Sequence, residues 1–126
     1  MMNDAHKLVA QSIVNLILPS TEYVSVRMMN DDDLPELDSG IEFAKKGDFE
    51  KAIEVFRKAV DNTKDKEKLA MIYYNIGICY QYSYKFGEAR SNLEMASSLS
   101  DEELYKKAIP KLEKMQSDYE EYMRQL

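Results

Sequence analysis

The chain has few of the residue types from which most catalytic and metal sites are built. Its 126 residues include one cysteine, one histidine and no tryptophan. One cysteine excludes an internal disulfide framework and a multi-cysteine zinc site, and one histidine excludes a two-histidine metal site within one chain. No glycine loop for phosphate binding and no nucleophile elbow can be identified. We therefore expect no enzyme activity, no cofactor and no metal.

Basic residues and long apolar runs are also scarce. The chain has 17 basic and 23 acidic residues and a formal charge of −6, which argues against binding to nucleic acids or anionic membranes. The longest apolar stretch near the start, residues 8–18, is interrupted by Gln11, Ser12 and Asn15. It is shorter than the ~20 apolar residues of a membrane-spanning helix, and no small-residue cleavage site follows. We expect a soluble chain with neither membrane insertion nor a signal peptide.

Apolar residues make up 44% of the chain, enough for the core of a single domain. Within residues 4–18 they recur at intervals of three and four, which predicts an amphipathic helix. Residues 21–29 are rich in β-branched and aromatic side chains and predict a short strand. Three adjacent carboxylates, Asp31, Asp32 and Asp33, predict an exposed turn before a helix and lack the ligand spacing of an EF-hand.

An internal repeat follows. An offset of 37 residues aligns small and large residues of two segments, pairing Gly40 with Gly77, Phe43 with Tyr80, Ala52 with Ala89, Phe56 with Leu93 and Ala59 with Ala96. This pattern resembles the tetratricopeptide repeat, a helix–turn–helix unit of ~34 residues. The resemblance covers about residues 33–103 and implies repeats at about 33–66 and 70–103. The three additional residues are expected in the connection at residues 64–68, where an exposed backbone tolerates insertion.

Small residues at the repeated positions let neighbouring helices approach closely. In the first turn, Gly47 is expected to close one helix in the left-handed region and Asp48 to cap the next. The second turn, from Tyr84 to Gly87, departs from this pattern. Residues 104–126 predict a capping helix with one apolar stripe, which Pro110 kinks or divides. That stripe consists of Leu104, Ala108, Leu112, Met115, Tyr119, Tyr122 and Leu126.

The predicted fold class is therefore all-α, a helix–turn–helix solenoid of about five helices with an additional N-terminal helix and a short strand. Residues 31–126 form the repeat domain. Residues 1–30 form a separate segment, interpreted as the remnant of an upstream domain because a single strand has no partner in a helical solenoid.

The resemblance implies a concave groove, lined by the first helix of each repeat, that binds a peptide or a partner helix. The positions carried over are Leu34, Leu37, Ile41, Ala44 and Lys45 in the first repeat, and Met71, Tyr74, Asn75, Ile78, Gln81 and Tyr82 in the second. The family's clamp for acidic C-terminal tails requires lysines and asparagines at defined points, and only Asn75 matches. The expected guest is therefore an apolar peptide or helix of another protein.

Two alternatives remain open from the sequence. The groove could be covered by the N-terminal helix, within one chain or across a homodimer. The chain could also be the C-terminal module of a larger bacterial envelope or scaffold protein, so its compartment stays open. We interpret His6 as a surface residue and Cys79 as a thiol packed in the core.

Overall fold

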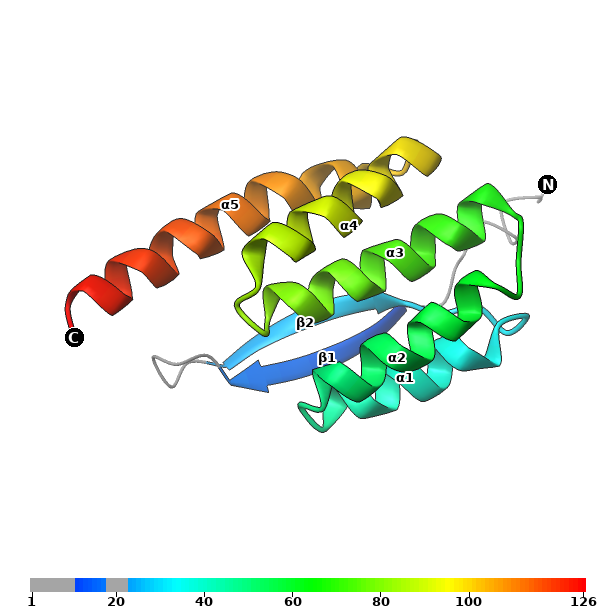
Figure 1. The fold of residues 1–126 in the computed structure, drawn as a ribbon, viewed down its shortest axis with the longest axis horizontal. Helices are drawn as coiled ribbons and strands as arrows, with labels where there is room; N and C mark the ends of the chain where they lie inside the picture. The colour runs from blue at the N-terminus through cyan, green and yellow to red at the C-terminus, as the bar shows by residue number, and fades with distance from the viewer. Residues whose placement is uncertain (1–10, 18–22) are drawn as a thin grey trace.

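The computed structural model describes residues 11–17 and 23–126. Within them the chain forms two strands followed by five helices, so the protein is mainly helical with a small sheet (Figure 1). The strands are β1 (Gln11–Ile17) and β2 (Tyr23–Met29). The helices are α1 (Pro35–Lys45), α2 (Phe49–Val60), α3 (Lys66–Gln81), α4 (Phe86–Leu99) and α5 (Glu103–Arg124).

Each helix packs against the next one in the chain, and glycines mark the closest approaches. A Cβ added to Gly40 on α1 would lie 2.3 Å from Cε1 of Phe56 on α2. A Cβ added to Gly77 on α3 would lie 2.7 Å from Cδ2 of Leu93 on α4. Both distances are shorter than a van der Waals contact, so only glycine fits without rearrangement. The prediction that these small residues permit close helix pairing is confirmed.

The turns inside the two helix pairs share one backbone feature. Gly47 has a φ of 79° and ends the first helix, and the Asp48 side chain accepts a hydrogen bond from Lys51 N–H at 3.2 Å, as predicted. Tyr84, which lies 37 residues after Gly47, also has a positive φ, of 63°. Its ring stacks on Tyr119 with centroids 4.6 Å apart. The Lys85 N–H donates to the Tyr80 C=O as the Asp48 N–H donates to the Phe43 C=O, so a left-handed residue ends the first helix of both pairs.

The connection between the helix pairs is shorter than predicted. Lys66 already begins α3, which has 16 residues whereas α1 has 11. The Asp65 side chain accepts hydrogen bonds from the N–H groups of Glu67 and Lys68, so it caps α3 at this earlier point. The additional residues of the second unit therefore lengthen its first helix instead of an exposed loop.

The predicted N-terminal helix over residues 4–18 is wrong for residues 11–17, which form β1. β1 pairs antiparallel with β2, with Val14 opposite Val26. Side chains alternate between buried and exposed, since Val14 is 0% exposed and Ile13 is 51% exposed. A strand with this alternation buries one face, and its backbone groups are paired with those of β2. Residues 4–10 and 18 of the predicted helix lie outside the described residues.

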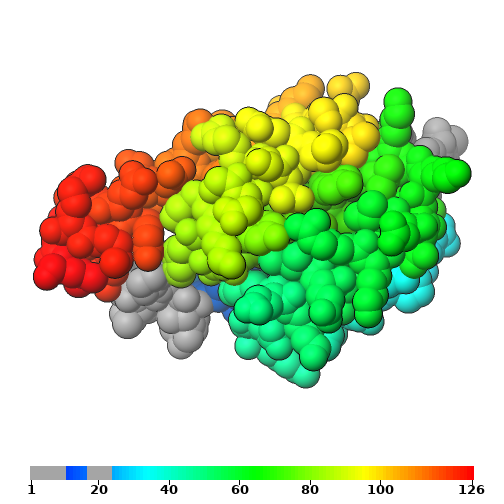
Figure 2. Space-filling model, in the orientation of Figure 1, coloured from blue at the N-terminus to red at the C-terminus, as the bar shows by residue number. Residues whose placement is uncertain are grey.

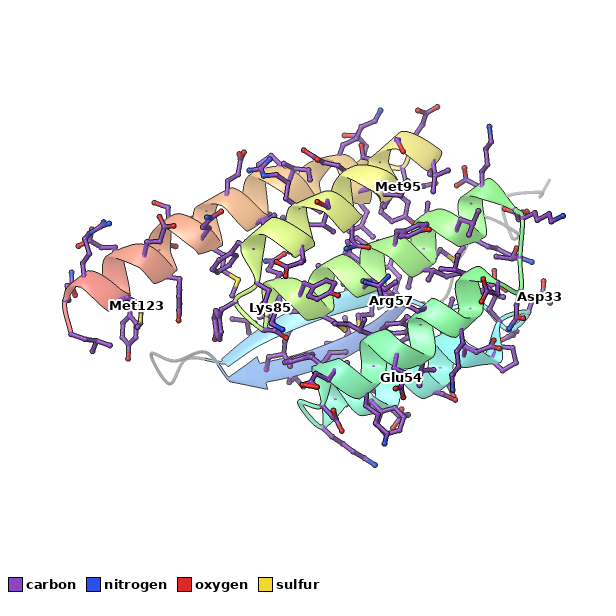
Figure 3. All side chains as sticks on the ribbon, in the orientation of Figure 1. Asp33, Glu54, Arg57, Lys85, Met95 and Met123 are labelled. Atoms are coloured by element: carbon purple, nitrogen blue, oxygen red, sulfur yellow. The ribbon has the colours of Figure 1, made fainter. Side chains whose placement is uncertain are left out.

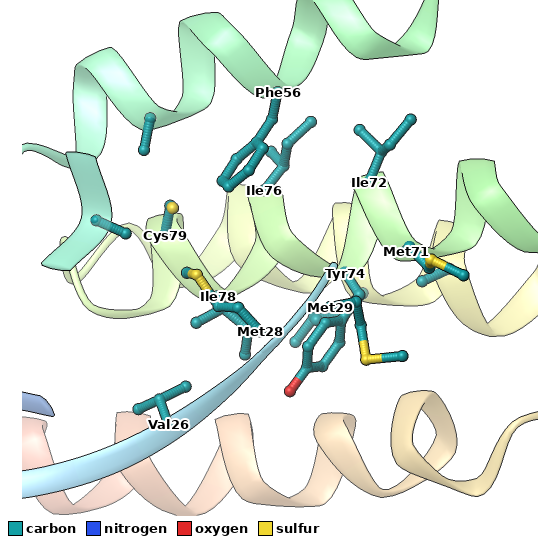
Figure 4. Packing of buried hydrophobic residues seen from close by; sticks show 14 of the residues in the cluster. Val26, Met28, Met29, Phe56, Met71, Ile72, Tyr74, Ile76, Ile78 and Cys79 are labelled. Carbon is teal, nitrogen blue, oxygen red and sulfur yellow. The ribbon is translucent and has the colours of Figure 1, made fainter. Parts of the chain in front are cut away.

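The strand expected at residues 21–29 is confirmed for Tyr23–Met29, and residues 21–22 lie outside the described part. It is not a lone strand, because β1 is its partner. β1 packs on α1 and β2 packs on α3, so the sheet lies across both helix pairs (Figure 1). Figure 4 shows Val26, Met28 and Met29 on one side of α3, with Phe56 across α3 on the other.

The last helix, α5, is continuous from Glu103 to Arg124 with Pro110 inside it, so Pro110 does not divide it. Its first half contributes Tyr105, Ala108 and Leu112 to the core. Its C-terminal end projects beyond α4 (Figures 1 and 2). Among the described residues, no helix is long and apolar enough to cross a membrane.

Candidate functional site

The residues predicted to line a concave groove lie on the face of the helices that carries the hairpin of β1 and β2. Seven of the nine principal positions are buried and two are not. The buried ones are Leu34, Leu37, Ile41, Met71, Tyr74, Asn75 and Ile78. Tyr82 is partly buried, and Lys45 is exposed and paired with Glu42 at 3.3 Å. The other two first-helix positions, Ala44 and Gln81, are also buried.

Asn75 holds β2 by its main chain. Met29 N–H donates to Asn75 Oδ1 at 2.8 Å, and Asn75 Nδ2 donates to Met29 C=O, also at 2.8 Å. The asparagine is 0% exposed, so both bonds are formed away from water. Its side-chain amide offers one donor and one acceptor, as the backbone of a neighbouring strand would. The position that matches the acidic-tail clamp is therefore engaged by the chain's own backbone.

Tyr74, the residue before Asn75 on α3, contacts the same strand. Its hydroxyl donates to the Arg27 C=O at 2.9 Å, and its ring lies 5.4 Å from that of Tyr105 on α5. Burial raises the pKa of Tyr74 well above its ordinary value, so the phenol remains a hydrogen-bond donor at neutral pH and into the alkaline range. Tyr74 thus links β2, α3 and α5.

An open groove remains between β2 and α5, which we call the β2–α5 groove. Its volume is about 360 Å³, near the lower end of ligand-binding clefts. Four predicted positions, Tyr74, Ile78, Gln81 and Tyr82, form part of its floor. The remaining lining residues come from its two walls: Ser25, Val26, Arg27, Leu104, Ala108 and Lys111.

The walls of this groove were not identified from the sequence. Arg27 lies in a segment read only as a strand, and Lys111 lies on a helix read only as a cap. Leu104, Ala108 and Lys111 recur at intervals of four and three on α5, so their shared face is visible in the sequence. That this face is turned toward β2 depends on tertiary packing, for which the sequence contains no direct signal.

A second, smaller hollow of about 280 Å³ lies beside β1, and Tyr82 lines it as well. Its other lining residues are Asn15, Leu16, Lys45, Lys46, Gly47 and Phe49. Lys45, predicted as a groove residue, therefore borders this hollow instead of the β2–α5 groove.

The remaining candidate residues have structural surroundings. Cys79 is 0% exposed, and burial raises the pKa of its thiol, which keeps it protonated and unreactive. In the acidic turn, Asp33 pairs with Lys68 at 2.9 Å, and Asp31 accepts a hydrogen bond from Asp33 N–H. Within the described residues, no cluster of three or more potential metal-binding side chains occurs. His6 lies outside them.

The sequence model of the DUF6340 family, described as a domain of unknown function, matches residues 38–126. The match covers most of α1 and all of α2 to α5, and both strands precede it. Neither a curated protein nor a solved structure matches the chain.

Proposed function

The chain belongs to the DUF6340 family, and we propose that it acts as a protein–protein interaction module that binds an extended segment of another protein in the β2–α5 groove. The observation that carries the proposal is the position of Tyr74, Ile78 and Tyr82 in an open groove. Aromatic residues are enriched at protein interfaces, and Tyr82 is partly exposed here beside the buried Tyr74 and Ile78. We take the guest to be an extended peptide, which is narrower than an α-helix about 10 Å wide.

The proposal includes a tetratricopeptide-like architecture for residues 33–103. Support comes from the two helix pairs, in each of which a glycine faces a large residue 16 positions later, Phe56 or Leu93. The left-handed residues Gly47 and Tyr84 add a second equivalence at the same offset of 37. In this architecture α5 is the capping helix and also one wall of the binding groove.

A structural role is the second candidate, and the hairpin favours it. The face that would receive an apolar guest is occupied by the chain's own strands, with the backbone of Met29 bound by Asn75. In this interpretation the module fills its own groove and serves only to join copies or domains of a parent protein. A homodimer is one form of that role.

Site-specific photocrosslinking separates the two functions. We expect that a benzoylphenylalanine at position 82, introduced in the cells that produce the protein, crosslinks to a second protein. The control places the same group at position 54, because Glu54 is exposed on α2, which contributes no residue to the groove (Figure 3). Equal crosslinking from both positions, or none from position 82, would contradict the interaction function.

Light scattering at several concentrations tests the structural alternative. A monomer that does not change with concentration is expected if the groove serves a different protein. A concentration-dependent dimer that crosslinks to itself from position 82 would favour the self-assembly role.

A further inference from the structure

The backbone N–H and C=O groups of β2 point to two sides of the strand. One side is that of β1, and the other is that of the β2–α5 groove. In an antiparallel pair, the N–H and C=O of one residue point to the same side, and successive residues alternate. Met29 directs both groups to Asn75, away from β1, and the register with β1 runs without a bulge. Arg27 and Ser25 share this parity, so their backbone groups also point away from β1.

The described residues occupy only part of this outward edge. Tyr74 donates to the Arg27 C=O. Among the described residues, no group bonds the Arg27 N–H or the N–H and C=O of Ser25. Both residues line the β2–α5 groove, and by their parity these three groups point to the side of β2 on which Asn75 and Tyr74 lie. An open strand edge of this kind is the element to which an extended peptide adds as a further strand.

The groove also carries a charge opposite to that of the whole chain. Arg27 on one wall and Lys111 on the other are both exposed, and neither forms an ion pair within the described part of the chain. Among the described residues that line the groove none is acidic, although the chain has a net charge of −6. Two free cations on opposite walls match a peptide that carries acidic side chains.

From this edge and these charges we propose that the β2–α5 groove binds an extended acidic peptide by strand addition to β2. The peptide backbone pairs with Ser25 and with the N–H of Arg27, and its acidic side chains lie beside Arg27 and Lys111. The inference rests on the proposed interaction function and specifies the chemistry of its guest.

The test selects short random peptides, displayed on phage, against the whole chain. We expect the enriched peptides to carry aspartate or glutamate at alternate positions, because alternate side chains of a strand point to the same side. A synthetic peptide from the selection should lose at least about tenfold in affinity when its backbone N–H groups are methylated, since strand pairing requires them.

Matched variants of the protein locate the peptide. Ser25→Pro removes the outward N–H and keeps every backbone bond to β1, and proline is tolerated at a strand edge. Peptide binding should therefore fall by at least about tenfold, and the helical signal should stay unchanged. Ser25→Ala, which loses only the exposed bond of Oγ to Asn15, should bind as the parent does. Arg27→Ala and Lys111→Ala should each weaken peptide binding about two- to fivefold. Lys106→Ala is the control and should not weaken it, because Lys106 is exposed on the opposite side of α5.

Three outcomes would overturn the inference: no enrichment of any peptide, enrichment without acidic residues, or equal binding by Ser25→Pro and Ser25→Ala. A fourth contradicting outcome would come from sedimentation, which measures the oligomeric state. If the parent chain is a dimer and Ser25→Pro is a monomer, the groove is occupied by a second copy of the chain. A partner protein could be crosslinked at position 82 and still bind the Ser25→Pro variant. That result would support the interaction function and contradict only the strand addition.

Discussion

Asn75 shows how one polar residue in an apolar interface can position a whole strand. Its two hydrogen bonds to Met29 are made to the main chain, so they fix the position and direction of β2 without depending on a particular side chain. A buried polar group without a hydrogen-bond partner lowers the stability of the fold. Here the Asn75 amide and the Met29 backbone are partners of each other. Asn75 therefore links the helical part to the hairpin.

Replacing Asn75 with alanine leaves the N–H and C=O of Met29 buried without partners. We expect the free energy of unfolding, measured with urea, to fall by about 2–4 kcal/mol. Asn92→Ala is the control, because Asn92 makes only an exposed bond to the Glu88 C=O, and it should change stability by less than about 0.5 kcal/mol. A loss below about 1 kcal/mol for Asn75→Ala would show that the bonds to Met29 add little.

Stability should decline at high pH because buried phenols resist ionisation. Burial raises the pKa of Tyr74 and, together with nearby Glu67 and Glu102, that of Tyr105. A raised folded-state pKa means that the stabilisation is complete below the unfolded value of about 10 and is lost as the pH rises above it. We expect the melting temperature to fall above about pH 10, and less steeply in Tyr74→Phe. An unchanged slope in that variant would contradict the assignment.

At the scale of elements, the helix pairs depend on close contact at two glycines. Gly40→Ala forces a methyl group into the Phe56 ring, so we expect a loss of about 1–3 kcal/mol in thermal or urea unfolding. Gly87→Ala is the matched control, because nothing lies within 4 Å of a Cβ there and α4 gains a better helix former. Its stability should stay equal or rise by up to about 1 kcal/mol. Equal effects of both changes would exclude close packing as the reason for Gly40.

The helical elements could be predicted from the sequence because their signals are local. The offset of 37 residues placed the turn at Gly47 and Asp48, and the apolar stripe after Glu103 predicted the last helix. The N-terminal strand could not be predicted in this way. The spacing of Ile13, Leu16 and Ile17 fits a helix, and the competing strand is stabilised by pairing with residues 23–29, which is a nonlocal interaction.

The candidate site was partly predictable for the same reason. Tyr74, Ile78 and Tyr82 follow from the helix pattern and do line the groove. Arg27 and Lys111 belong to different elements 84 positions apart in the chain, so only the folded structure brings them to one groove. From the sequence, an N-terminal helix covering the groove was one open alternative, and the described residues instead form a hairpin that packs on α1 and α3.

At the scale of the whole molecule, α3 is the central element. It packs against α2, α4 and β2, and most of its residues are buried, whereas only three of the 22 residues of α5 are. Hydrogen exchange should therefore be slowest in α3 and fast in the end of α5 beyond Tyr119, where Met123 is 46% exposed. Mass spectrometry of the exchanged chain measures this order. Exchange in α3 as fast as in the end of α5 would show that α3 is not the stable centre.

The hairpin has a mechanical consequence for any protein that binds here. Because β1 rests on α1 and β2 rests on α3, the sheet acts as a brace across the boundary between the two helix pairs. The bonds of Asn75 and Tyr74 hold β2 to α3, so bending at that boundary would pull β1 away from α1 or β2 away from α3. The angle between the pairs is therefore set when the chain folds. A guest meets a surface that is already shaped, and little conformational entropy is lost when it binds.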